Sequence, residues 1–135
     1  MRAPKKPRRT EQKTVFLLFH GGKVALVKRP DTGLLAGLWE FPCTAGHLEE
    51  KRATQRLTEQ GASLASLSRS VDATHIFTHI EWHMQGYAAV CAREMTHWDG
   101  RELVYVTLRE LTQDYGVPTA YRAFVRAALD FSPTP

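Results

Sequence analysis

The sequence is poor in cysteine and in long apolar runs. Only two of its 135 residues are cysteines, Cys43 and Cys91, and neither belongs to a CxxC pair or a Cys/His cluster with metal-site spacing. This usage favours ordinary buried thiols over a disulfide, and therefore a cytosolic protein. No apolar run approaches the roughly 18 residues that a membrane-spanning helix needs, and the N-terminus lacks the apolar stretch of a secretion signal. We expect no membrane association and no secretion.

The charge of the chain is unevenly distributed. The formal net charge is +4, yet residues 1–13 hold six basic side chains and one acidic one, whereas residues 14–135 hold twelve basic and thirteen acidic. Residues 1–13 are therefore expected to form a basic, flexible tail, which either approaches phosphates or serves only as a solubilising linker. With 43% apolar and 24% charged residues, the remainder, 14–135, is predicted to fold as one domain.

The hydrophobic pattern predicts an α+β fold, a mixed sheet with helices packed on it. The segment from Asp72 to Ala92 is expected to be largely extended, with Ile76, Thr78, Ile80, Trp82 and Met84 on a mainly apolar face and the odd-numbered residues on a polar and aromatic face. Thr107 and Glu110 have the spacing of a capping box. Strands are expected at 14–19, 23–28, 39–41 and 102–106, and helices at 49–60, from Thr107, and from Pro118 to about Leu129.

The sequence offers little support for a zinc site or for a nucleophilic serine. His75, His79 and His83 share a face of a strand, but consecutive members lie about 13 Å apart at about 3.3 Å per residue, too far for one zinc ion. No GxSxG or equivalent context for a nucleophilic serine occurs. Polar-face histidines are the favoured interpretation.

The order of elements resembles the Nudix fold, whose hydrolases carry a box of the form G-x5-E-x7-R-E-U-x-E-E-x-G-U. That box places several carboxylates on one helical face to hold magnesium against a diphosphate. Counted from Gly46, the first acidic position is Arg52; counted back from Gly61, only Glu59 of the acidic positions survives. A metal site is therefore not expected, and the domain is predicted to be non-catalytic.

A second resemblance is more specific. The stretch from Lys28 to Pro42 closely resembles the KRP-x-x-GLLAGLWEFP stretch in the C-terminal domain of the MutY adenine DNA glycosylases. The segment from His75 to His79 is similar to the family's (H)-x-F-S/T-H loop, and the one from Gly116 to Ala120 is similar to the segment before its terminal helix. The apolar residues of the first stretch are expected to be mainly a packing cluster.

This resemblance implies a Nudix-like domain that reads 8-oxoguanine opposite adenine in duplex DNA. In that family a separate N-terminal domain, with a four-cysteine iron–sulfur motif, excises the adenine. That motif does not occur here, so we expect no cofactor in this chain, and the N-terminal glycosylase domain is an expected partner in the same or another chain. The implied localisation is cytoplasmic, at the nucleoid.

The Phe77-Thr78-His79 segment is the candidate lesion-binding site. Oxidation at C8 turns the N7 acceptor of guanine into a donor and adds a carbonyl acceptor beside it, and a hydroxyl can address both. Thr78 is thus the predicted reader, while Phe77 can wedge at the base step and His79 can bind a phosphate. The structural alternative is that these are ordinary core and surface residues. Arg29 is a further candidate DNA contact, or else pairs with Glu40 or Asp31.

Two other functions stay open at this point. A Nudix-type hydrolase would need a magnesium site built from Glu40, Glu49, Glu50 and Glu59 in an unexpected arrangement. A protein-interaction module would use an exposed aromatic surface around Trp82 or Trp98. We expect instead a DNA-repair recognition module whose folded part, being nearly neutral, binds DNA weakly on its own.

Overall fold

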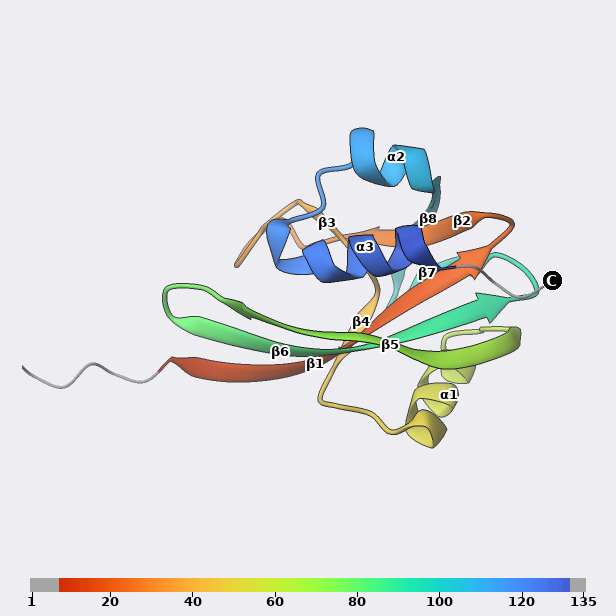
Figure 1. Ribbon diagram of the computed structural model, residues 1–135, viewed down its shortest axis with the longest axis horizontal. Coiled ribbons are helices and arrows are strands. Elements are labelled where there is room, and N and C mark those ends of the chain that lie inside the picture. Colours follow the sequence, from red (N-terminus) through yellow and green to blue (C-terminus); the bar gives the residue numbers. More distant parts are fainter. Residues whose placement is uncertain (1–7, 132–135) are drawn as a thin grey trace, which may run out of the picture.

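A curled sheet lies between helices on its two faces in the computed structural model, which describes residues 8–131 (Figure 1). The strand order is β5-β6-β1-β2-β8-β7, with β3 beside β2 and β4 beside β1. The sheet is mixed, because β1 runs parallel to β6 and antiparallel to β2. The predicted α+β class is confirmed, since helices pack on a mixed sheet. The strands are β1 Arg9–His20, β2 Lys23–Lys28, β3 Trp39–Glu40, β4 Cys43–Ala45, β5 Leu64–Ile76, β6 Ile80–Cys91, β7 His97–Trp98 and β8 Arg101–Thr107.

The helices cover opposite faces of this sheet. Helix α1 (Glu50–Glu59) lies on one face, and α2 (Leu108–Gln113) and α3 (Arg122–Asp130) lie on the other (Figure 1). The capping box before α2 is confirmed, since the Thr107 hydroxyl accepts from the Glu110 N–H and the Glu110 carboxylate accepts from the Thr107 N–H. The hydrogen bond from the Thr107 N–H to the carboxylate, with a smaller contribution from the Thr107 side chain, lowers the pKa of Glu110. The last helix begins with a 3-10 turn over Thr119–Tyr121.

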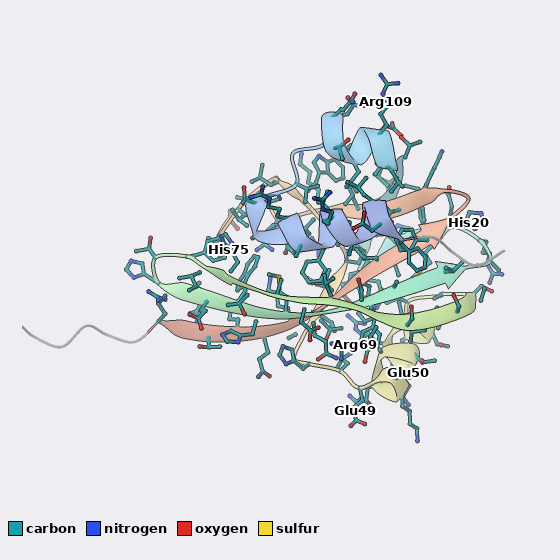
Figure 2. The ribbon with its side chains drawn as sticks, viewed as in Figure 1. His20, Glu49, Glu50, Arg69, His75 and Arg109 are labelled. Atoms are coloured by element: carbon teal, nitrogen blue, oxygen red, sulfur yellow. The ribbon has the colours of Figure 1, made fainter. Side chains whose placement is uncertain are left out.

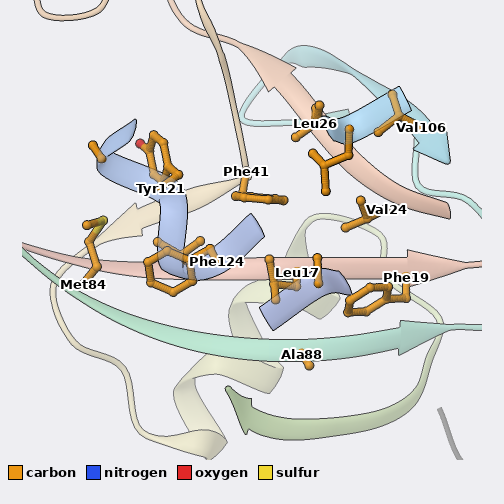
Figure 3. Close-up of a cluster of buried hydrophobic side chains, with 14 of the residues drawn as sticks. Leu17, Phe19, Val24, Leu26, Phe41, Met84, Ala88, Val106, Tyr121 and Phe124 are labelled. Carbon is orange, nitrogen blue, oxygen red and sulfur yellow. The ribbon is translucent and has the colours of Figure 1, made fainter. Parts of the chain in front are cut away.

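Strand β1 supplies apolar residues to two separate cores, because successive side chains of a strand point to opposite faces. Val15, Leu17 and Phe19 pack with α3, including Phe124, in the core of Figure 3. On the other face, Phe16 and Leu18 pack with α1. Both cores are buried from solvent, so the sheet is the middle layer of a three-layer domain.

The first strand is longer than the sequence predicts. It begins at Arg9 rather than Thr14, and from Arg9 onward it pairs with β6, with Arg9 opposite Ile80. The polar residues 9–13 of the predicted tail therefore belong to the sheet, and backbone pairing rather than burial accounts for their conformation. Residues 1–7 of that tail lie outside the described residues.

The expected single alternation across 72–92 is wrong. Strands β5 and β6 form an antiparallel hairpin, and the bend between them shifts the phase of the pattern. In β6 the even-numbered Trp82 and Met84 are buried as predicted, but in β5 the odd-numbered Ala73 faces the same core and Ile76 is 54% exposed. The bend therefore decides which residues are presented to solvent.

Candidate nucleic-acid interface

The candidate lesion-binding residues lie at the tip of the β5–β6 hairpin. Only Phe77, Thr78 and His79 separate the two strands, and the Phe77 N–H donates to the Ile80 carbonyl over 2.7 Å. Both strands are long, so the tip projects past the helices at one end of the molecule (Figure 1). The predicted site residues on this segment are thus brought together on a protruding bend.

Thr78 is an accessible candidate. Its side chain is exposed and lies in the bend itself, outside the hydrogen-bond ladder of the strands. His79 is exposed beside it, and its carbonyl accepts from the Arg9 N–H over 3.1 Å. A hydroxyl at this exposed place can both donate to and accept from a ligand that contacts the bend.

Phe77 occupies a different position, at the root of the bend. Its ring is half-buried and packs edge-on against Trp82, with centroids 4.8 Å apart, and against His75 at 4.7 Å. Trp82 is 1% exposed and contacts Tyr121 in turn. In this conformation the Phe77 ring attaches the bend to the core. To insert between DNA bases, the ring would have to move away from Trp82.

Arg29 lies behind this aromatic cluster rather than at the tip. Its Nε donates to the Leu34 carbonyl and its Nη1 to Glu40, each over 2.9 Å, and its guanidinium lies 5.5 Å from the centre of the Trp82 ring. Burial lowers the pKa of Arg29, but Glu40, Tyr121 and Cys43 together outweigh burial, and the pKa is raised. The predicted pairing of Arg29 with Glu40 is confirmed, so Arg29 stabilises the fold. Its role as a DNA contact stays a prediction.

Glu40 is the centre of this buried network. It is 2% exposed, accepts from Arg29 and from the Tyr121 hydroxyl, and lies 3.6 Å from Arg101. Burial, with Cys43 and Glu40 nearby, raises the pKa of Tyr121 far above its usual range, so its hydroxyl stays protonated and donates. Burial and Glu40 likewise raise the pKa of the Cys43 thiol to about 11. Of this network the sequence indicated only the Arg29–Glu40 pair, because Tyr121 lies 81 residues from Glu40 along the chain.

The apolar residues of 34–41 form a packing cluster, as predicted, with one exception. Leu34, Leu35, Trp39 and Phe41 pack against the core, and Phe41 is fully buried. Leu38 is 40% exposed. The positive φ of Gly37 turns the chain just before it, which points this side chain away from the cluster.

The four carboxylates considered for magnesium are not brought together. Glu40 is buried against Arg29, whereas Glu49 and Glu50 project near the start of α1 (Figure 2). Glu59 ends α1, about 13 Å along the helix axis from Glu50 at about 1.5 Å per residue. Within residues 8–131, no group of three or more His, Cys, Asp or Glu side chains has the geometry of a metal site. The donor set does not fit a magnesium site.

The histidine row and the two tryptophans are also placed by the structure. His75 packs on Phe77, whereas His83 points to the opposite face of the sheet, where it contacts Glu81 over 2.6 Å. Trp82 and Trp98 are 1% and 0% exposed, so the alternative of a protein-interaction module that uses an exposed aromatic surface around them has no support in the structure. No helix in the described part of the chain is long and apolar enough to cross a membrane.

Comparison with known proteins identifies the class of protein. Residues 14–127 match the NUDIX domain family, and the chain belongs to it. A MutT NUDIX hydrolase from Burkholderia pseudomallei has a TM-score of 0.69 at 21% identity, covering 89% of this chain and 98% of that one.

Within this family the chain is related to the adenine DNA glycosylases, which confirms the resemblance seen in the sequence. The human adenine DNA glycosylase is 34% identical over an alignment of 96 residues that covers 64% of this chain and 18% of the human protein. The C-terminal domain of mouse MUTYH, in a crystal structure of its complex with human PCNA, has a TM-score of 0.66 at 23% identity, covering 94% and 95% of the two chains. The matched segment spans less than a fifth of the human enzyme.

Proposed function

We propose that this chain is the lesion-reading domain of a DNA-repair adenine glycosylase, in which the Thr78 hydroxyl distinguishes 8-oxoguanine from guanine opposite adenine. The exposed position of Thr78 on a protruding bend is the observation that carries the proposal. The relationship to the adenine DNA glycosylases supports the same substrate class. Excision of the adenine, and the iron–sulfur cluster that accompanies it, belong in this proposal to an N-terminal glycosylase domain.

The chemistry of the oxidised base suits a hydroxyl. Guanine presents N7 and O6 acceptors in the major groove. In 8-oxoguanine N7 carries a hydrogen and C8 carries an oxygen, so a donor and an acceptor lie side by side. One threonine hydroxyl can accept from N7–H or donate to O8, whereas unmodified N7 offers it only an acceptor. His79, exposed next to Thr78, is placed to contact a phosphate in the same complex.

Replacing Thr78 by alanine is expected to reduce the preference for an 8-oxoguanine:adenine duplex over a guanine:adenine duplex by about 1–3 kcal/mol, the size of one good base contact. Fluorescence anisotropy with both duplexes at low salt measures this preference, since the folded part carries little net charge and binds weakly at high salt. Thr78→Ser should retain most of it.

The matched control is Thr74→Ala, which removes an exposed threonine hydroxyl from β5 of the same hairpin. It is expected to leave the preference unchanged. Equal discrimination by the wild type and by Thr78→Ala would refute the role assigned to this hydroxyl.

A further inference from the structure

The bend that carries Thr78 is supported on one side only. Strand β5 is the edge of the sheet, so the hairpin has a single neighbouring strand, β1, beside β6. The first residues of β1 lie at the same end of the molecule as the hairpin tip (Figure 1). Residues 8–13, called here the entry segment, are therefore the structural neighbour of the reading bend.

The entry segment is attached to the bend through its backbone. The Arg9 N–H donates to the carbonyl of His79, which is itself part of the bend. From there the two strands pair residue for residue, Arg9 with Ile80 and Glu11 with Trp82. In such a parallel ladder alternate residues direct their backbone groups to the same neighbour, so Arg9 and Glu11 face β6 and Thr10 faces away from it.

Side chains of the entry segment reinforce this attachment. Glu11 accepts from the indole N–H of Trp82 over 3.2 Å, and the Lys13 ammonium lies 3.6 Å from the centre of the Trp82 ring. Arg8 lies 3.8 Å from Glu81. Phe77 packs on Trp82. The contacts of Glu11 and Lys13 with Trp82 therefore connect the entry segment to Phe77, the first residue of the bend.

We propose that the entry segment is a positioning element of the reading site. It holds the Phe77-Thr78-His79 bend in one orientation, and detaching it from β6 weakens lesion discrimination without altering any residue of the bend. The discrimination half of this inference rests on the proposed function, whereas the structural half does not.

Arg9→Pro tests the backbone attachment, because proline has no N–H to donate to His79. Amide hydrogen exchange across residues 77–80 is expected to accelerate about 3- to 10-fold, the effect of losing one backbone hydrogen bond. The preference for the 8-oxoguanine duplex over undamaged duplex should fall by a similar factor. Thr10→Pro is the matched control: its N–H faces away from β6, and it should change neither quantity.

A second pair of variants tests the side-chain attachment and does not depend on the proline variant folding. Glu11→Ala removes the acceptor of the Trp82 indole N–H, and Glu11→Gln retains one. We expect faster exchange across 77–80 and weaker discrimination for the alanine variant, with rescue by glutamine. Equal exchange rates in Arg9→Pro and Thr10→Pro, and in both Glu11 variants, would overturn the inference. A wild type without lesion preference would instead refute the proposed function, and the exchange result would still decide the positioning role.

Discussion

Replacing Glu40 by glutamine is expected to lower the free energy of unfolding by about 3–5 kcal/mol, the usual cost of removing one partner from a buried ion pair. Glu40 is 2% exposed, and its carboxylate pairs with Arg29 and Arg101 and accepts a hydrogen bond from Tyr121. The Arg29 side chain is only 15% exposed, so water cannot replace the lost carboxylate. Glutamine keeps the shape and leaves a buried positive charge without a counter-charge.

Urea unfolding followed by circular dichroism measures this loss. The matched control is Asp31→Asn, which neutralises an exposed carboxylate in the connection that leads into β3. It should change stability by no more than about 0.5 kcal/mol. If both variants lost the same small amount, the Glu40 network would not be the stabilising centre that its geometry indicates.

Gly86→Ala is expected to cost about 3 kcal/mol, at the upper end of the usual range for overpacking. A Cβ at this position would lie 2.6 Å from the Val71 carbonyl oxygen and 2.7 Å from the Phe124 ring. The carbonyl belongs to the neighbouring strand β5. The ring belongs to α3 and is fully buried. Neither neighbour can retreat without moving an element of the fold.

Gly116→Ala provides the control, because no atom lies within 4 Å of the Cβ it would add and its φ is not in the left-handed region. This substitution should be neutral or slightly stabilising. Thermal unfolding of both variants separates steric conflict from a general effect of losing a glycine. Similar melting temperatures for the two would contradict the close approach of α3 to β6.

Several elements were predictable because one local signal defined them. Strand β2 was expected at residues 23–28 and is found there, since a turn precedes it and Pro30 follows it. Helix α1 differs from its predicted range by one residue at each end. The capping box of Thr107 and Glu110 depends only on neighbours three residues apart. In each case the information lies within a few consecutive residues.

The remaining features depend on partners distant in sequence. The polar start of β1 is a strand because β6 lies beside it, which no periodicity of residues 9–13 reveals. The phase of β5 follows from a three-residue bend that an uninterrupted alternation hides. For the candidate site, the alternation placed Thr78 on the apolar face, and only the resemblance to a loop motif indicated an accessible position. The sequence could not show that Phe77 packs on Trp82, or that Arg29 is held by Glu40.

The apolar run of β1 has a consequence for how the chain selects its native strand alignment. Because Val15 to Phe19 are buried on both faces of the sheet, a slip by one residue would still put apolar side chains on each face, and hydrophobicity alone discriminates poorly against it. Thr14 breaks this degeneracy. It is fully buried, donates to the Gly46 carbonyl over 2.8 Å and accepts from the Leu48 N–H over 3.0 Å. A shifted alignment would leave this buried hydroxyl without hydrogen-bond partners. The single polar side chain that precedes the apolar run therefore specifies the native alignment.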